Sequence, residues 1–276
     1  MRRRLAAVLA LLLVGCSAAP RVIPIAVAPG QAPPAADRIA DYPEAFQAIG
    51  VVMSRDLGLP VPPVSLYLYP NRDAFEQGLK AERHMEPGLA RDAASFARGV
   101  GGPDKILVNE QALVRTPWPE HVKFLAHEFT HTIQFDLAGG RRVRSAQWLR
   151  EGYADWVAFR VLDSLRLGRF ADERARRVGH VRRAIDRTPF PPLAELATFP
   201  QWVSWRSRQG ADVTYGQAFL AVDLLIERKG HPAAADYFRR LGNFRGAFGQ
   251  DLTAFDREFA AHLRDLRSEE IRDLRG

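Results

Sequence analysis

Leu125-Ala126-His127-Glu128-Phe129-Thr130-His131 places two histidines four residues apart in an apolar, helix-forming segment. In an α-helix these side chains lie one turn apart and roughly 40° apart on the same face. Both rings can therefore bind one metal ion at about 2.0–2.1 Å. Glu128 directly follows His127, so its carboxylate can act on a metal-bound water without binding the metal. The alternative is a pair of hydrogen-bonded core histidines.

A second segment, Trp148-Leu149-Arg150-Glu151-Gly152-Tyr153-Ala154-Asp155, offers the third ligand that a catalytic zinc requires. Glu151 can supply it from a second helix, leaving the fourth position for water. Asp155 lies one turn beyond Glu151 and is placed to accept the free ring N–H of His127, which would orient that ring. The spacing predicts one Zn²⁺ per chain, bound by His127, His131 and Glu151.

The two segments together resemble the gluzincins, the thermolysin-like zinc metallopeptidases. The residues around the two motifs are similar to those of bacterial peptidase MA-like proteins. The resemblance implies an α+β, zincin-like domain: a small mixed sheet, then the zinc-binding helix, then a mostly helical C-terminal part. It implies hydrolysis of peptide bonds with Glu128 as the general base. It also implies that the edge strand ahead of the zinc helix, here residues 106–109, binds extended substrate; a plain structural hairpin is the alternative.

Tyr215 is the second residue of the sequence TYGQAFLAVDLLIERKG, which is similar to a segment of peptidase MA-like proteins, and begins the expected helix over 215–228. The resemblance implies that its phenol donates a hydrogen bond to the substrate oxyanion. The alternative is a tyrosine that only packs at the start of a helix. Tyr153 and His231 are weaker candidates, and Tyr153 is expected in the core.

The N-terminus has the pattern of a bacterial lipoprotein signal at residues 1–15. Three arginines precede the apolar segment Leu5–Val14, which is too short to span a membrane, and Leu13-Val14-Gly15-Cys16 resembles a lipobox. Cys16 is the only cysteine, so no disulfide framework exists and lipidation is the expected role; an unlipidated signal peptide is the alternative. We expect the protein at the cell envelope, anchored to the membrane by this lipid, on the periplasmic face of any outer membrane.

Residues 16–40 are rich in Ala and Pro and predict a flexible tether, followed by a metallopeptidase domain over 41–276 with possible sub-lobes 41–140 and 141–276. The apolar fraction of 47% is that of a globular protein. Removing the signal would lower the formal charge from +7 to +4. Export excludes nucleic acid as the expected partner and leaves a peptide or protein substrate and the membrane.

Hydrophobic periodicity predicts the remaining elements. Helices are expected over 41–57, 72–79, 116–138, 146–167 and 215–228, and strands over 64–69, 95–100 and 105–108. Arginines 174, 176, 177, 182, 183 and 187 line a helix that is expected to be a solvated face, with contact to anionic lipid or glycan as the alternative.

Two other functions remain open. An aminopeptidase of the same group would carry a Gly-x-Met-Glu-Asn motif ahead of the zinc helix, and RGVGGPDKILVNE lacks it, which favours an endopeptidase. A non-catalytic envelope binding or scaffold protein with a metalloprotease-like zinc site is the other alternative.

Overall fold

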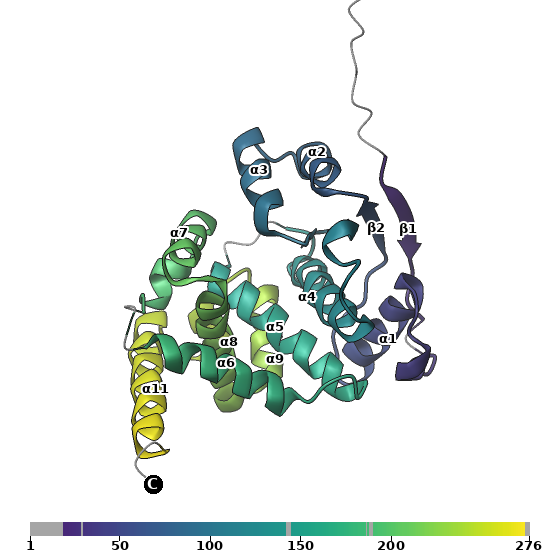
Figure 1. Cartoon of the computed structure of the whole chain (residues 1–276). Helices are drawn as coiled ribbons and strands as arrows, with labels where there is room; N and C mark the ends of the chain where they lie inside the picture. The colour runs from purple at the N-terminus through teal and green to yellow at the C-terminus, as the bar shows by residue number, and fades with distance from the viewer. Residues whose placement is uncertain (1–18, 29, 142–144, 186, 188–189, 274–276) are drawn as a thin grey trace, which may run out of the picture.

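The computed structural model describes residues 19–273 apart from 29, 142–144, 186 and 188–189, with side chains up to residue 266. It is an α+β fold in which a small sheet near the N-terminus is followed by a mostly helical part (Figure 1), as the sequence predicts. The signal segment and Cys16 lie outside the described residues.

The four strands are β1 (Arg21–Ile25), β2 (Val64–Tyr69), β3 (Gly99–Gly101) and β4 (Lys105–Asn109). They lie in the order β1-β2-β4-β3; β2 and β4 are parallel, and both outer pairs are antiparallel. The 3-10 turns are Ala36–Arg38, Glu110–Ala112 and Leu193–Leu196.

The N-terminal helices are α1 (Tyr42–Arg55), α2 (Arg72–Arg83) and α3 (Pro87–Phe96). The central pair is α4 (Trp118–Leu137) and α5 (Gln147–Ser164). The C-terminal helices are α6 (Phe170–Ala184), α7 (Phe199–Gln209), α8 (Ala211–Lys229), α9 (His231–Arg239), α10 (Phe244–Phe248) and α11 (Leu252–Asp273).

Side-chain alternation in β2 explains how helices cover both faces of the sheet. Leu66 and Leu68 point into the large core shared with α1 and α4. Tyr69 points to the other face, into a smaller cluster with Phe75 and Leu79 of α2. The sheet is thus a layer with α1 and α4 on one face and α2 and α3 on the other. The large core continues through α5, α8 and α11.

Helix α4 crosses this core because its apolar residues recur on one face. Val122, Leu125, Phe129 and Ile133 are all fully buried. Pro119 lies in the first turn, where its missing N–H has no cost, and Gly139 adopts a φ of +64° just after the helix ends. The predicted helix over 116–138 is confirmed within the usual variation of helix ends.

Three sequence predictions are wrong in this part of the chain. Residues 21–25 belong to the sheet as β1, so they are not part of a flexible tether. The first half of the strand predicted over 95–100 is instead the end of α3 and its C-cap, and β3 begins at Gly99. The strand over 106–109 is interior, between β2 and β3, so β3 is the edge strand beside α4.

No helix among the described residues is both long enough and apolar enough to cross a lipid bilayer.

Candidate metal centre

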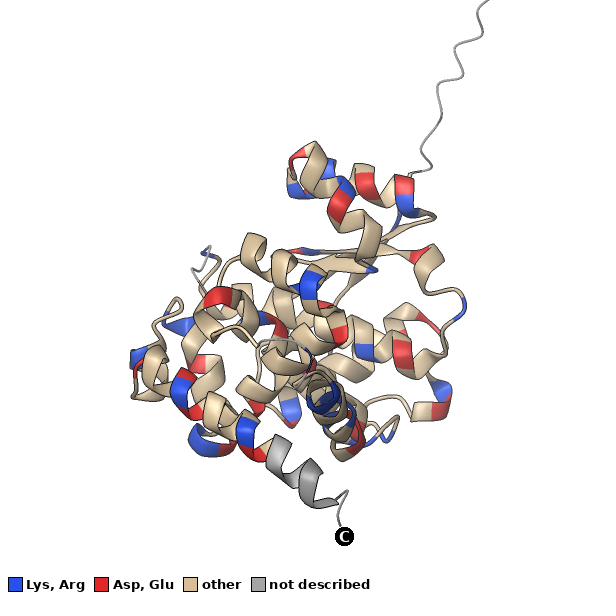
Figure 2. Cartoon of the chain, turned by 60° about the vertical axis from the view of Figure 1, so that its left-hand side comes forward, with Lys and Arg blue, Asp and Glu red and all other residues tan. Residues whose placement is uncertain are grey.

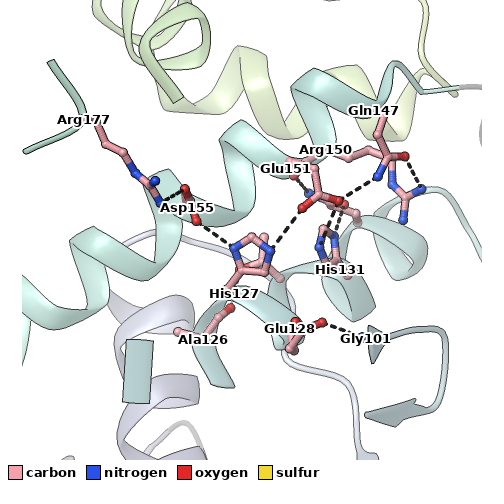
Figure 3. A network of polar contacts seen from close by, with 12 residues as sticks. Gly101, Ala126, His127, Glu128, His131, Gln147, Arg150, Glu151, Asp155 and Arg177 are labelled. Carbon is pink, nitrogen blue, oxygen red and sulfur yellow. Dashed lines mark hydrogen bonds and ion pairs between the residues drawn. The ribbon is translucent and has the colours of Figure 1, made fainter. Parts of the chain in front are cut away.

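Helices α4 and α5 bring His127, His131 and Glu151 together (Figure 3). One potential ligand atom from each residue lies within 4.8 Å of the other two. The side chains of His127, His131 and Glu151 are 14%, 8% and 9% exposed. The sequence prediction that these three residues form one possible metal group is confirmed.

The separations between the histidine nitrogens and the carboxylate are close to those of ligands that share one metal ion, with each histidine facing a different oxygen of Glu151. Ligand bonds of about 2.0–2.1 Å at tetrahedral angles separate neighbouring donor atoms by about 3.3–3.5 Å. The distance from His127 Nε2 to Glu151 Oε2 is 3.3 Å, and that from His131 Nε2 to Glu151 Oε1 is 3.6 Å. The donor set of two imidazoles and one carboxylate is one that zinc binds with a further position open.

The other ring nitrogens are already engaged, which leaves both Nε2 atoms for a cation. His127 Nδ1 lies 2.9 Å from Asp155 Oδ1, and His131 Nδ1 lies 3.0 Å from Gln134 Oε1. A proton on each Nδ1 satisfies these acceptors and leaves the Nε2 lone pairs facing the carboxylate of Glu151. Such an arrangement of lone pairs requires a shared metal ion or protonated rings, because otherwise it is repulsive.

Electrostatics of the metal-free group show how strongly it attracts positive charge. Burial by itself lowers the pKa of His127, but hydrogen bonds to Asp155 and Glu151 and nearby carboxylates outweigh it and raise the pKa well above its usual value. Burial by itself raises the pKa of Glu151, but the two histidines outweigh it and hold the pKa well below its usual value. A dication placed between these groups meets the same field.

Helix α5 also supports the ligands from behind. Gln147 Nε2 donates to Glu151 Oε1 at 2.8 Å, one turn earlier on the helix. Gln134 Nε2 donates to the carbonyl of Arg150 at 2.9 Å while its Oε1 accepts from His131. These contacts fix the orientation of two ligands. Neither glutamine was identified from the sequence, although the spacing of Gln147 before Glu151 and of Gln134 after His131 carries the signal.

Asp155 joins His127 to Arg177 of α6. Burial raises the pKa of Asp155, but the charge of Arg177 and the bond to His127 outweigh it, so the net pKa is lowered. Arg177 is 18% exposed and ion-paired, so the prediction that it lies on a solvated helix face is wrong for this residue. Asp155 contacts His127, as the helical spacing predicts.

Glu128 lies beside the ligand group and is held by the edge strand. The Gly101 N–H donates to Glu128 Oε2 at 2.6 Å. A Cβ on Gly101 would lie 2.1 Å from the backbone oxygen of Glu128, so only glycine allows β3 to approach α4 this closely. No described group hydrogen-bonds to Oε1, which is therefore available to accept a proton.

Tyr215 of α8 lies across from His127, with ring centroids 6.3 Å apart. Both residues, with Glu128 and Asp155, line a cavity of about 260 Å³. Helix α8 reaches this position because Gly152 of α5 packs directly on it: a Cβ there would lie 2.3 Å from the carbonyl oxygen of Ala218. The structure therefore brings Tyr215 to the cavity beside the metal group.

The environment of Tyr215 keeps its phenol protonated. Burial and the charges of Glu151, Asp155 and Glu128 raise its pKa well above the usual 10.0. Trp202 of α7 contacts its ring edge-on at 5.0 Å. The phenol can therefore donate a hydrogen bond into the cavity over the whole neutral range.

Tyr153 and His231 lie elsewhere, in the core behind the site. Tyr153 is fully buried, as the sequence predicts, and its hydroxyl lies 2.9 Å from His231 Nε2. The imidazole of His231 stacks on the rings of Tyr153 and Trp156. This pair stabilises the junction of α5 with α9.

Comparisons of the chain with protein-family models, with curated proteins and with solved structures find no significant match. The case for a metal centre therefore stands on the donor atoms, distances and supporting contacts of the site itself.

Proposed function

We propose that the protein is a zinc-dependent peptidase of gluzincin type that hydrolyses peptide bonds. The observation that carries this proposal is the position of Glu128: a carboxylate beside, and separate from, a buried His-His-Glu group, facing a cavity. When bound, zinc would lower the pKa of a water and polarise a carbonyl oxygen.

Glu128 is the proposed general base. The Gly101 N–H fixes one carboxylate oxygen, so Oε1 is oriented to take a proton from the attacking water. The same oxygen can then deliver that proton to the leaving amine. The Tyr215 phenol, kept protonated by its surroundings, is the proposed hydrogen-bond donor to the oxyanion that develops on the substrate carbonyl.

Strand β3 is the proposed docking edge for an extended substrate. The Asn109 N–H donates to the carbonyl of Arg98 at 2.8 Å, and the Gly102 N–H donates to the carbonyl of Lys105 at 3.0 Å. Backbone groups alternate along a strand, so those of Gly99 and Gly101 face away from β4. The Gly101 N–H is taken by Glu128, so this edge can offer a peptide the N–H and carbonyl of Gly99 and the carbonyl of Gly101. A peptide bound there as a further strand would lie next to the metal group, an arrangement that suits an endopeptidase.

The test is the variant Glu128→Gln of a chain that begins at Ser17. It retains the hydrogen bond from Gly101 but loses the basic oxygen, so we expect one zinc per chain and a 10²–10⁴-fold lower kcat on an unfolded protein substrate. Elemental analysis measures the metal, with His127→Ala as the variant expected to lose it.

Asp136→Asn is the matched control, because Asp136 is an exposed carboxylate near the end of α4, outside the cavity. Unchanged hydrolysis in Glu128→Gln would refute the mechanism. If the wild type and its variants bind zinc but hydrolyse no substrate, the result would favour the non-catalytic envelope protein.

We also propose attachment of the protein to the cell envelope through a lipid on Cys16. Strand β1 begins at Arg21, so only the residues 17–20 separate that cysteine from the folded domain. Four residues span at most roughly 14 Å. A lipid there would hold the domain against the membrane, and labelling with a radioactive fatty acid in wild type and Cys16→Ala would test this.

A further inference from the structure

The cavity beside the metal group presents two arginines without carboxylate partners. Its four cations are Arg98, Lys123, Arg177 and Arg206. Lys123 pairs with Glu120, and Arg177 pairs with Asp155. Arg98 and Arg206 form no ion pair with any described residue, and the guanidinium of each lies over an aromatic ring.

Arg206 is held in place although its charge is unpaired. Its guanidinium lies over the ring of Phe96 at 4.1 Å, so it reaches from α7 to the end of α3. Its Nε is buried and has no hydrogen-bond acceptor within the described part of the chain. A buried donor without an acceptor is unfavourable unless a ligand supplies one.

Helical spacing connects Arg206 with the proposed oxyanion donor. Trp202 and Arg206 lie one turn apart on the same face of α7, and Trp202 contacts the ring of Tyr215. Arg98 also lines the cavity, directly before β3, with its guanidinium 5.5 Å from the centre of the Phe124 ring. The two unpaired cations therefore stand at the cavity shared with Tyr215 and His127.

The carboxylates of the cavity do not neutralise these cations. Asp155 is engaged by His127 and Arg177, and Glu128 is held next to the metal group by Gly101. Asp212 is exposed in the first turn of α8, where water and the helix dipole stabilise its charge. Elsewhere acidic and basic residues are interspersed along the visible helices (Figure 2).

A second cavity, next to His131, is also lined by positively charged side chains. It measures about 300 Å³, and its charged lining side chains are Arg141 and Arg150, with no carboxylate among the described lining residues. A peptide that passes the metal group would thus meet arginine on both sides.

We propose that the protein selects substrates that carry a carboxylate next to the scissile bond, with Arg206 and Arg98 as the residues that recognise it. The inference rests on the proposed peptidase function. The carboxylate is either an Asp or Glu side chain or the C-terminus of a peptide, because the guanidinium binds both in the same bidentate manner.

The experiment uses the zinc-loaded chain and a peptide library with free or amidated C-termini, with cleaved bonds identified by mass spectrometry. We expect acidic residues to be enriched about tenfold at one or both positions flanking the cleaved bonds. If the C-terminal carboxylate is the recognised group, enrichment disappears and cleavage instead requires the free C-terminus.

Three variants assign the preference to the cavity. Arg206→Gln and Arg98→Gln should each reduce it, and Arg206→Glu should reverse it toward Lys and Arg. Arg208→Gln is the matched control on α7, because Arg208 is exposed and stacks on Trp205 away from the cavity. Cleavage that shows neither an acidic preference nor a requirement for a free C-terminus, or a preference that Arg206→Glu leaves unchanged, would overturn the inference and leave the peptidase function standing.

A binding measurement covers the case in which nothing is cleaved. Zinc-loaded Glu128→Gln is titrated with a fluorescent peptide containing Glu and with its Gln counterpart. Tighter binding of the Glu peptide that Arg206→Glu abolishes would support the carboxylate site even if the peptidase function fails. Equal binding of both peptides, and of the same peptides with amidated C-termini, would refute it.

Discussion

Replacing Asp155 by Asn tests whether the bond behind His127 controls metal affinity. The carboxylate accepts from His127 Nδ1 at 2.9 Å and pairs with Arg177 through its other oxygen. Asparagine has the same shape and keeps an acceptor for His127, but it removes the charge that makes the imidazole a better donor to metal. The perturbation is therefore electrostatic rather than steric.

The expected magnitude follows from the kind of hydrogen bond that changes. A charge-assisted bond contributes about 1.5–3 kcal/mol and a neutral one about 0.5–1.5 kcal/mol. The difference of about 1–1.5 kcal/mol weakens zinc binding roughly 5- to 15-fold. Asp155→Ala, which loses the acceptor as well, should weaken it about 10- to 100-fold.

The assay is competition for zinc with a chromogenic chelator, at a pH where the folded state is fully populated. Asp163→Asn is the matched control, because Asp163 lies on α5 and its side chain is 40% exposed. If Asp155→Asn, Asp155→Ala and Asp163→Asn all bind zinc as tightly as the wild type, then Asp155 does not orient a metal ligand and the argument from His127 fails.

Three further predictions concern the surroundings of the site. Tyr215→Phe should keep zinc and lower kcat about 10- to 1,000-fold, since it removes only the phenol donor. Gly152→Ala should lower the free energy of unfolding by about 1–3 kcal/mol, because its Cβ would lie 2.3 Å from the Ala218 carbonyl oxygen. His231→Phe should reduce the decrease in the free energy of unfolding that the protein shows in acid. Burial lowers the pKa of His231 from 6.5 to about 4, so below pH 6.5 the unfolded state binds a proton that the native state does not. The free energy of unfolding therefore falls by at most about 3 kcal/mol as the pH drops from 6.5 toward 4.

Each of these has its own measurement and control. An unchanged kcat in Tyr215→Phe would leave that tyrosine a packing residue. Denaturant unfolding compares Gly152→Ala with Gly168→Ala, whose Cβ would make only an ordinary contact at 3.7 Å; equal effects would contradict the close approach of α5 and α8. For His231→Phe, unfolding at pH 7.5 and pH 4 in both proteins suffices, and an identical loss in the two would show that another group titrates.

The metal group could be predicted from the sequence because each part is a local spacing. His127 and His131 share a helix, and Glu151 and Asp155 share another, so helical geometry alone fixes two pairs. Their meeting required only that α4 and α5 pack together. The packing itself is imposed by the long apolar face of α4, which its sequence pattern predicts.

The sheet edge and the supporting contacts were not predictable in this way. Strand β1 is short and contains Pro24, which masks its pattern, and the parallel pairing of β2 with β4 joins segments that α2 and α3 separate in the chain. Arg177 resembled its solvated neighbours in sequence, because only the crossing of α6 near α5 determines that it meets Asp155.

The amide signal of Gly101 can report on the state of the site in NMR spectra. An N–H on the open side of an edge strand normally exchanges its hydrogen quickly with solvent, yet this one donates to a carboxylate that is itself buried. Its proton should therefore exchange slowly and resonate far downfield. Glycine amides occupy a distinct region of a nitrogen-correlated spectrum, so this single peak can report zinc uptake, inhibitor binding or the charge on Glu128 without any introduced label.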